Sequence, residues 1–449
     1  MITAKYKFLI ILLFSTLKQP DYELRNGSRV GVVGAGPAGT FFSYFLDKYA
    51  RERNIELGIV IFDKKKFYEK GIRGCNMCAG IISSNLVEKM NDAGIKLPEN
   101  VVQRYIRGYV LETKAGSLHL EKRTWDKIAT VFRGRGPRGS ELEHLIGFDE
   151  FLLSLVSDKI ELVPEFVNNI EIGANNVKLE TDSNKIGFDA VVIATGLNSA
   201  MPKKLELLDF GYKKPAEYLS IQTEIPLEKE EIAFRFGDYI YSYNLGINNL
   251  KFAAIIPKKG YLTVSLVGKS LNSDNLFDFL SHPRLKRRFP PKWDISEDYL
   301  RKCCLCKPFI PVGHAKNPYT DRLAIIGDAN CSRLFKNGLE SAFISAEAAA
   351  KIMIEEGFSK KAFKRFDKKI SELRKDNFYG RVLFSINQAI AENNFLSNSL
   401  THVALREQLM AETPINDILW DMLTGEDSYR HIFSRLIKQN IPLKVLLRR

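Results

Sequence analysis

VGVVGAGPAG at residues 30–39, followed by IVIFD at residues 59–63, decides the fold of this chain. The pattern predicts a buried strand, a glycine turn, a helix over residues 37–51 and a second strand that ends in an acid. A parallel strand pair joined by a helix is the first unit of an α/β sheet. We therefore expect an α/β fold built around this unit.

Each residue of the glycine turn has a physical role if the ligand is an adenine dinucleotide. Gly34 permits the tight turn, Gly36 lets a pyrophosphate approach the backbone, and Gly39 lets helix and strand pack closely. The N-terminus of the helix offers unpaired N–H groups to the phosphates. Four further residues are predicted to belong to the same site. Pro37 and Ala38 open the helix, and Asp63 and Lys64 stand at the end of the second strand. Asp63 would accept a hydrogen bond from a ribose hydroxyl group.

A second GxGxxG occurs at residues 134–139, but no acid follows it at the distance that a ribose contact needs. The polar residues after it predict a loop rather than a helix. We interpret it as a mobile basic loop that carries Arg133, Arg135 and Arg138. Two readings stay open, namely a solvated surface loop and a contact with an anionic group of a substrate.

Composition limits the class of protein. The chain has 449 residues, 45% of them hydrophobic, and a formal net charge of +13, which is enough for two or three globular domains. A basic chain suits anionic partners, and peripheral contact with an anionic membrane surface is one of them. Nucleic acid ranks last, because no nucleic-acid-binding motif is present.

The N-terminal residues 1–28 are expected to be an extension. The apolar run at residues 8–14 is too short to span a bilayer, which takes about 20 residues, and no cleavage site of small residues follows it. We expect a cytoplasmic protein, with a weak tether to the inner face of the membrane as the alternative.

The pattern of strands and helices predicts three further parts. A discontinuous cofactor-binding domain comprises residues 29–100, 123–210 and 307–358. Alternating residues predict an antiparallel substrate domain at 101–122 and 211–306. The remaining residues, 359–449, are predicted to be helical.

Three spaced motifs support a family resemblance. They are the glycine turn with Asp63, the small-residue end of a strand at Thr195-Gly196, and Gly327-Asp328-Ala329 ahead of a helix that starts near Gly338. Together they resemble the flavoproteins that include p-hydroxybenzoate hydroxylase and geranylgeranyl reductase. The resemblance implies FAD, a glutathione-reductase-like Rossmann-type domain, and contacts of Asp328 and Gly338 with the cofactor.

The geranylgeranyl-reductase-like branch matches best. Its cysteine–glycine loop corresponds to Cys78-Ala79-Gly80, which this resemblance assigns to the flavin, with Cys78 as a candidate catalytic residue. Two features depart from the wider group. Thr195 stands where the hydroxylases carry an aspartate that helps to hold NADPH. The identity of the electron donor therefore stays open, with NAD(P)H as one candidate. Ser341 stands where a second glycine is usual.

Six cysteines occur in clusters rather than scattered. Cys75 and Cys78 form a CxxC, and Cys304 and Cys306 form a CxC, so that two loops together offer four sulfurs. Three interpretations stay open: a zinc or iron–sulfur site, a redox disulfide near the flavin, and small buried residues. Cys303 and Cys331 are left out of this set.

An aromatic strand supplies the last candidate. Tyr241 and Tyr243 alternate with Ser242 and therefore face the same side of a strand. They either line a substrate pocket above the flavin, with Tyr241 as a candidate catalytic residue, or belong to the core.

The resemblance leads us to expect an FAD-dependent oxidoreductase that reduces a carbon–carbon double bond of a lipophilic, isoprenoid-like small molecule. An aromatic monooxygenase is the first alternative. A flavoprotein without catalysis that binds a partner is the second.

Overall fold

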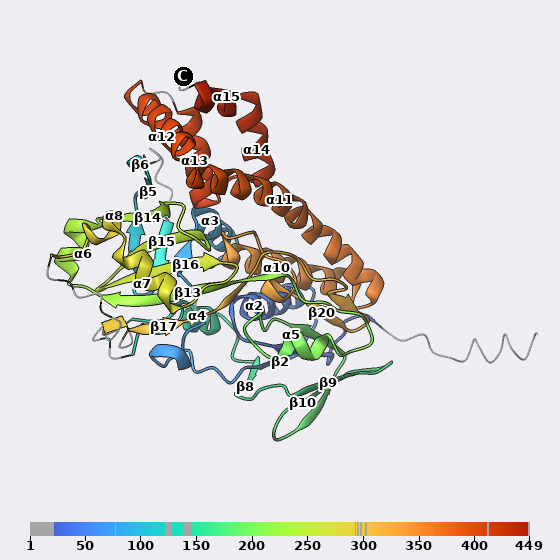
Figure 1. Cartoon of the computed structure of the whole chain (residues 1–449). Helices are drawn as coiled ribbons and strands as arrows, with labels where there is room; N and C mark the ends of the chain where they lie inside the picture. The colour runs from blue at the N-terminus through green and yellow to red at the C-terminus, as the bar shows by residue number, and fades with distance from the viewer. Residues whose placement is uncertain are drawn as a thin grey trace, which may run out of the picture.

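The computed structural model describes residues 22–76, 78–121, 128–138, 140, 145–291, 293, 296, 299–300, 303–410 and 413–447. The N-terminal apolar run and Gly139 of the second glycine motif lie outside these residues. Figure 1 shows a sheet with helices in the lower half, a larger sheet beside it, and a helical end at the top.

The first sheet is the parallel one. Its order is β19-β20-β12-β1-β2-β8, and only β19 runs antiparallel to its neighbour. Its strands are β1 (Arg29–Val33), β2 (Gly58–Phe62), β8 (Glu161–Val163), β12 (Ala190–Ile193), β19 (Tyr319–Thr320) and β20 (Leu323–Ile325). Runs of valine and isoleucine form this sheet because both of its faces are covered.

Helices cover one face of the first sheet and a three-stranded meander covers the other. Phe343 makes edge-to-face ring contacts with Phe41 and Phe45, at centroid distances of 5.0 and 5.1 Å, and so joins the two central helices. The elements of this part are α2 (Pro37–Glu52), the single turn η1 (Gly71–Arg73), α3 (Ser84–Asp92), α4 (Phe148–Ser154), β9 (Asn169–Ile172), β10 (Val177–Glu180), β11 (Lys185–Phe188), α5 (Met201–Leu205), η2 (Gly327–Ala329) and α10 (Gly338–Glu356).

The second sheet has the order β17-β13-β16-β15-β14-β5-β6, with β18 also paired to β13. It is antiparallel except between β14 and β5. Its strands are β5 (Gly108–Thr113), β6 (Ser117–Glu121), β13 (Glu217–Pro226), β14 (Tyr239–Asn244), β15 (Leu250–Lys258), β16 (Tyr261–Gly268), β17 (Cys304–Cys306) and β18 (Phe309–Pro311).

Smaller elements complete this half. A three-stranded sheet lies beside the second sheet, and three helices cover one face of the second sheet. The strands of the small sheet are β3 (Ile81–Ile82), β4 (Val102–Ile106) and β7 (Ile128–Val131). The three helices are α6 (Lys229–Arg235), α7 (Ser273–Ser281) and α8 (Pro283–Lys286).

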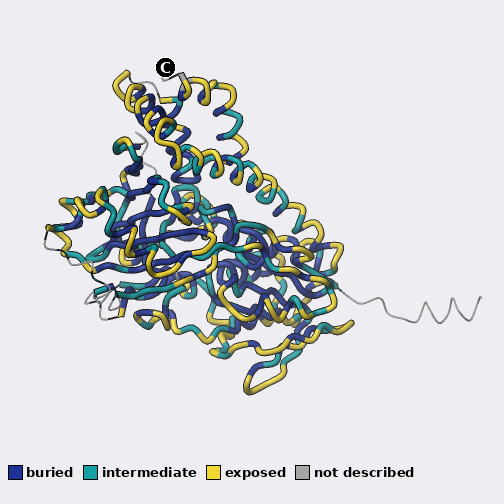
Figure 2. The backbone as a smooth tube through the Cα atoms, in the orientation of Figure 1, coloured by how far each residue is buried: buried dark blue, intermediate teal, exposed yellow. Residues whose placement is uncertain are grey.

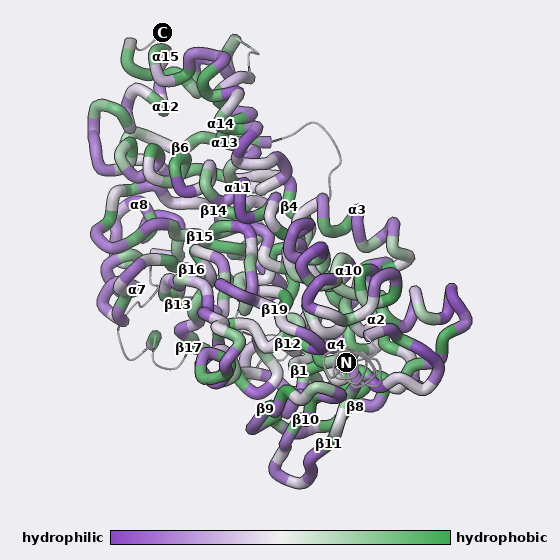
Figure 3. The backbone as a smooth tube through the Cα atoms, turned by 90° about the vertical axis from the view of Figure 1, so that its right-hand side faces the viewer, coloured by the Kyte–Doolittle hydropathy of each residue, from purple (hydrophilic) through white to green (hydrophobic). Residues whose placement is uncertain are grey.

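The C-terminal part is helical, as expected. It contains α11 (Lys360–Glu392), α12 (Asn394–Leu409), α13 (Pro414–Thr424), α14 (Tyr429–Lys438) and α15 (Ile441–Leu447). Its apolar side packs on the second sheet, where Trp420 meets Tyr109. Figure 2 shows buried backbone concentrated in the sheets and exposed backbone along the helical end. Figure 3 shows hydrophobic and hydrophilic stretches alternating along these helices, as amphipathic packing requires.

The expectation of an α/β fold with a Rossmann-type sheet, an antiparallel sheet and a helical end is confirmed. Among the described residues, no helix is both long enough and apolar enough to cross a bilayer.

Candidate functional site

The glycine turn lies between β1 and α2, and its three glycines differ in how closely other atoms surround them. Gly34 has φ +107°, and a Cβ there would lie 2.7 Å from the carbonyl oxygen of Ala194. A Cβ at Gly39 would lie 1.8 Å from the carbonyl oxygen of Gly34. At Gly36 the nearest atom is Asn76 Nδ2, at 3.6 Å. Packing therefore requires Gly34 and Gly39, whereas Gly36 leaves an open approach to the backbone.

Asp63 is bound to the glycine turn. Its Oδ2 accepts a hydrogen bond from the backbone N–H of Ala35 at 2.7 Å, and its Oδ1 accepts one from the N–H of Lys65 at 2.8 Å. Burial raises the pKa of this carboxyl group, although both hydrogen bonds favour the charged form. The acid thus holds the turn in place beside the position expected for a ribose.

The lysine next to this acid differs from the predicted one. Lys64 is exposed, and its Nζ lies 5.5 Å from the ring centroid of Phe166. Lys65 is the inward residue, and its Nζ donates to the carbonyl oxygen of Cys75. Burial lowers the pKa of Lys65. Sequence reasoning missed Lys65 because the pattern KKK at residues 64–66 does not show which lysine turns inward.

A buried ion pair holds Asn76, the residue that lies in front of Gly36. Arg133 Nη2 donates to Asp149 Oδ2 at 2.9 Å, and Arg133 Nε donates to the other carboxylate oxygen. Asn76 Nδ2 donates to the same carboxylate. The basic loop is therefore anchored through Arg133, which corrects the expectation of a mobile loop, while Arg138 at its end is exposed. Arg135 is likewise paired, with Glu150.

The strand ends next to β1 supply the other side of the site. Gly327, with φ +64°, would place a Cβ 2.9 Å from the Cβ of Ala38, so η2 packs on the first turn of α2. Asp328 follows directly, and its Oδ1 accepts from Ser332 Oγ at 2.5 Å. Burial raises the pKa of Asp328. The carboxylate thus lies at the carboxyl edge of the parallel sheet, near the glycine turn.

Two further glycines open onto empty space. Neither Gly196, with φ +62°, nor Gly338, the first residue of α10, would bring a Cβ within 4 Å of another described side chain or backbone. Between the strand and Gly196, the buried Thr195 Oγ1 has no hydrogen-bond partner among the described residues. We use the name cradle for the turn 34–39, Thr195-Gly196 and the loop 327–338 taken together.

The loop Cys78-Ala79-Gly80 contacts the second sheet. Gly80 has φ +74°, and a Cβ there would lie 2.0 Å from the carbonyl oxygen of Val131 and 3.3 Å from Lys258 Nζ. The Gly80 N–H points to Cys78 Sγ, at 3.4 Å. The loop therefore lies where the cradle half of the molecule meets the second sheet.

The four candidate cysteines do not form a metal site. Within the described residues no group of three or more His, Cys, Asp or Glu side chains has the arrangement to hold an ion, and the six cysteines are free thiols. Cys304 and Cys306 are paired through β17 to Glu224 and Gln222 of β13. Burial, with Cys75 and Glu224 nearby, raises the pKa of Cys304 to about 11. The loops approach each other, but the expected zinc or iron–sulfur site is not supported.

Tyr241 and Tyr243 lie in the core. Tyr241 is 4% exposed, makes an edge-to-face contact with Phe236, and has Arg288 over its ring. Tyr243 packs on Phe279 of α7. Both belong to the apolar cluster under α6 to α8, on the side of the sheet away from Ala79 and Phe335. This packing agrees with the core alternative and not with the pocket.

The opposite face of the second sheet is the one that meets the cradle half. Lys336 Nζ lies 4.0 Å from the ring centroid of Phe252, and Tyr218 contacts the ring of Phe335. Lys258 lies beside Gly80 at the other end of β15. We call this side the inner face. Alternation assigns the residues of this face from Phe252 onward in β15, where the register shift between Leu250 and Phe252 has been passed.

A polar row crosses the inner face. The register aligns Cys306 with Gln222, Gln222 with Ser265, and Ser265 with Ala254. Gln222 and Ser265 are buried. The next row contains Glu224, whose Oε2 accepts from Thr263 Oγ1 at 2.7 Å and whose Oε1 is 3.3 Å from Lys258 Nζ. These two rows of the inner face therefore carry small and hydrogen-bonding side chains, whereas Tyr109, Leu111, Ile240 and Ile256 form an apolar part of the same face.

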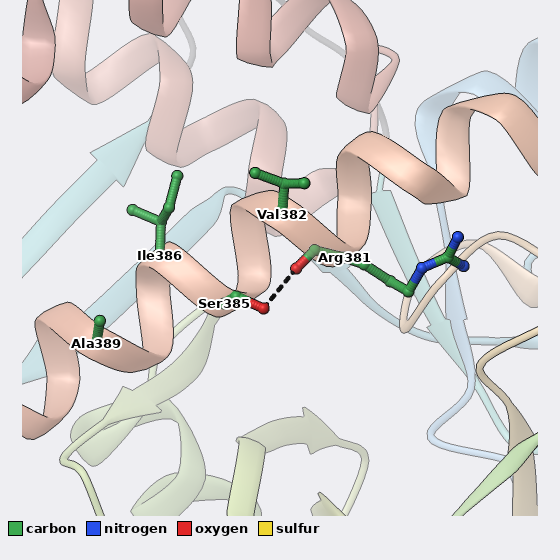
Figure 4. A pocket seen from close by; sticks show the side chains of 5 residues that line it. All are labelled: Arg381, Val382, Ser385, Ile386 and Ala389. Carbon is green, nitrogen blue, oxygen red and sulfur yellow. Dashed lines mark hydrogen bonds between the residues drawn. The ribbon is translucent and has the colours of Figure 1, made fainter.

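A surface hollow lies elsewhere, on α11. Figure 4 shows its lining, and Ser385 Oγ donates to the carbonyl oxygen of Arg381 there. Its lining residues are Arg381, Val382, Ser385, Ile386 and Ala389. None of these residues belongs to the cradle or to the inner face.

The comparisons with known proteins concern the fold. No family model matches the chain, and no curated protein matches it. Solved structures do match. A flavoprotein/dehydrogenase from Cytophaga hutchinsonii is 15% identical with a TM-score of 0.60, covering 88% of this chain and 92% of that one. The flavin-dependent brominase Bmp2 is 13% identical with a TM-score of 0.57, covering 92% and 100%.

A third similar structure is the p-nitrophenol 4-monooxygenase PnpA from Pseudomonas putida DLL-E4. It is 15% identical with a TM-score of 0.56, and the match covers 93% of this chain and 98% of that one. At such identities the likeness establishes the fold alone. The chain therefore has the α/β flavoprotein fold of FAD-dependent monooxygenases, with a Rossmann-like parallel sheet, an antiparallel second sheet and a helical C-terminus.

Proposed function

We propose that this protein is an FAD-dependent oxidoreductase that oxygenates a small organic substrate. The observation that carries the proposal is the cradle. Gly36, Gly196 and Gly338 each present open backbone, and the buried Thr195 Oγ1 between them has no partner in the described chain. An extended dinucleotide meets such a surface with its pyrophosphate at the glycine turn and its remaining length along the sheet edge.

Different residues of the cradle would bind different parts of the cofactor. Gly36 and the N-terminus of α2 would receive the pyrophosphate, with Asn76 beside it. Asp63 would accept a hydrogen bond from the adenosine ribose, and Asp328 would accept one from the ribityl chain. The N-terminus of α10, at Gly338, would supply a positive end to the ring system.

FAD, when bound, supplies two-electron chemistry and the activation of oxygen, which no side chain of this protein can supply. Oxygenation uses two electrons from a donor such as NAD(P)H, places one atom of O₂ in the substrate and reduces the other to water. The chain's own task is to hold the substrate against the cofactor and to exclude water. We assign that task to the part of the inner face that carries the polar row, because the C-terminal helices pack on the part around Tyr109.

Oxygenation is favoured over the reduction of an isoprenoid double bond by the polar row. Gln222 and Ser265 are buried hydrogen-bonding groups at the centre of the inner face. A lipophilic chain would offer no partner to Ser265, and none to Gln222 beyond its long contact with Ser220 Oγ, and an unsatisfied buried group costs about 1–3 kcal/mol. A substrate with polar groups would satisfy them. The reductase of the geranylgeranyl type remains the second candidate, supported by the loop Cys78-Ala79-Gly80, which lies against the inner face at Lys258.

The cofactor assignment is tested by Gly36→Val. The backbone at Gly36, with φ −68° and ψ 178°, suits any residue, so the variant should fold, while its branched side chain blocks the approach to the turn. We expect yellow, FAD-containing wild-type protein and an FAD affinity at least about 100-fold lower in the variant, which corresponds to roughly 2.7 kcal/mol. FAD release is measured by absorbance and by calorimetric titration.

Gly116→Val is the matched control, because a Cβ there meets only the methyl group of Thr401, at 3.7 Å. Equal FAD retention in both variants would contradict the assignment. The reaction class is then decided with ¹⁸O₂ and a panel of phenols and polyprenyl compounds. A gain of one labelled oxygen atom supports oxygenation, whereas a gain of two hydrogen atoms assigns the protein to the reductases.

A further inference from the structure

The helical end exposes more apolar side chains than its share of the chain. Half of the large apolar side chains that are exposed in the described part of the molecule lie within residues 378–446, although this segment is less than a fifth of the sequence. Single exposed apolar residues are ordinary, but several on one surface mark a site of interaction. The helical end is therefore a candidate interaction surface.

Helix α15 is apolar on both of its sides. Ile441 and Val445 are buried and belong to the apolar cluster that joins the helical end to the second sheet. Leu443 and Leu446 lie on the outer side and are 54% and 55% exposed. Because the inward pair already attaches the helix, the fold does not require leucines on the outer side. An outward apolar face is unfavourable in water and suits a contact outside the chain.

The ends of two neighbouring helices extend this apolar face. Leu409, the last residue of α12, is 89% exposed, and the adjacent Met410 is also exposed. Ile437, near the end of α14, is exposed as well. α15 packs against both α12 and α14, and Figure 1 and Figure 3 show these helices and the C-terminus at one end of the molecule. We call these three residues, with Leu443 and Leu446, the apical patch.

The charge around the apical patch is positive. Residues 428–449 contain six Lys or Arg residues and no Asp or Glu. Two exposed cations adjoin the apolar residues directly. Arg406 precedes Leu409 by about one helical turn, and Lys438 follows Ile437. The patch therefore combines apolar side chains with cations that suit an anionic partner.

Most acids of the adjoining helices are engaged within the fold. Arg435 pairs with both Asp421 and Asp427. Glu407 is buried, and its Oε2 accepts a hydrogen bond of 2.7 Å from the backbone of α13. Asp417, at the start of α13, is the exposed acid of α12 to α14 among the described residues. Exposed Lys and Arg side chains consequently dominate the charge at this end of the molecule.

The composition of the apical patch suits a lipid surface better than a protein partner. The patch consists of Leu, Ile and Met, with a lysine beside it. Protein interfaces are instead enriched in Trp, Tyr and Arg and depleted of Lys. Helices that lie on membranes combine aliphatic residues with Lys and Arg, because the apolar side chains enter the boundary of the acyl chains and the cations meet anionic headgroups.

We propose that the apical patch attaches this protein to a membrane surface that carries anionic lipids. The aliphatic side chains of the patch enter the headgroup region, and Arg406 and Lys438 pair with lipid phosphates. The attachment is peripheral, since it uses the ends of helices that lie at the surface. It goes beyond the proposed function and involves no residue of the cradle or of the inner face.

Large unilamellar vesicles are the probe, made of phosphatidylcholine alone or of phosphatidylcholine with an equal amount of phosphatidylglycerol. Co-sedimentation of the full-length protein measures binding. We expect binding to the anionic vesicles that weakens as salt is added, because salt screens exposed charges. Leu409→Asp should bind them at least about tenfold more weakly, since it removes an apolar side chain from the contact and adds a negative charge. Leu443→Asp should show a similar loss.

Leu207→Asp is the matched control, because Leu207 is 84% exposed and follows α5, outside the helical end. It introduces the same change and should bind as the wild type does. The double variant Arg406→Gln, Lys438→Gln should bind the anionic vesicles about tenfold more weakly, because it keeps the apolar contact and loses two cations. Circular dichroism melts verify that the variants are folded.

Three results would overturn the proposal: no binding of the wild type to the anionic vesicles, equal binding to the two kinds of vesicle, or equal binding of Leu409→Asp and Leu207→Asp. A wild-type dimer that does not bind vesicles and that Leu409→Asp dissociates would overturn it as well, because a second copy of the chain would then occupy the patch. Analytical ultracentrifugation detects that dimer.

Discussion

At the scale of the residue, the environment of a side chain decides its chemistry. Cys304 and Cys306 look reactive in the sequence because they stand in a CxC. Yet burial raises the pKa of the Cys304 thiol to about 11, and it raises that of Cys306 as well. The thiolate is the nucleophile, so a thiol with a raised pKa is almost entirely protonated near neutral pH. Both residues then act as small packing groups on the inner face.

Cys304 is therefore expected to react slowly with iodoacetamide at pH 8, and faster as the pH rises toward 11. Relative to an ordinary thiol of pKa about 8.5, the thiolate fraction falls by roughly two orders of magnitude. Mass spectrometry of labelled peptides measures the rate, with the urea-unfolded protein as the reference. A rate at pH 8 equal to that of the unfolded chain would contradict the burial of this thiol.

At the scale of the element, two neighbouring ion pairs attach the loop 133–138 to α4, and they differ in burial. Arg133 and Asp149 are buried, and Asp149 also accepts from Asn76. Arg135 and Glu150, one residue further along the helix, lie at the surface side with 40% and 22% of their side chains exposed. Removing a partner from a buried pair leaves an uncompensated charge, whereas an exposed pair is already screened by water.

Asp149→Ala should lower the free energy of unfolding by about 3–5 kcal/mol. Glu150→Ala, the matched control, should lower it by at most about 1 kcal/mol. Urea denaturation followed by circular dichroism gives both values. The Asp149 variant should also bind FAD more weakly than the control does, because Asn76 loses the carboxylate that holds it beside Gly36. Similar losses of stability in the two variants would refute the distinction.

At the scale of the whole molecule, the helical end is attached to the cofactor cradle. Asn377 of α11 bonds Ser332 and Leu334, and Tyr429 of α14 bonds Leu334. Gly380 makes this attachment close, since a Cβ there would lie 2.6 Å from the ring of Tyr429. Figure 1 shows α11 running from the body of the molecule to the helical end. The cradle loop and the helices should consequently unfold together.

Gly380→Val is expected to lower the melting temperature and FAD retention in parallel, because the side chain forces Tyr429 away from the loop. Overpacking of this kind costs about 1–3 kcal/mol. Ser385→Ala, at an exposed position of the same helix, should change neither quantity. Thermal melts followed by FAD fluorescence and by circular dichroism test the coupling. Two separate transitions in the wild type would show that the helical end is independent of the cradle.

The sequence by itself determined the elements whose signal is local. Apolar strands, Gly34, Gly36 and Gly39 with Asp63, and Gly327-Asp328 before a helix sufficed to predict the parallel sheet and the cradle, because turn geometry and hydrophobic period act over a few residues. Only the tertiary structure decided which neighbour turns inward. It selected Lys65 rather than Lys64, buried Arg133 against Asp149, and put Tyr241 into the core. It also brought Lys336 over Phe252, 84 positions away in the chain. These choices depend on strand register and on contacts between distant segments, for which a single sequence carries no local signal.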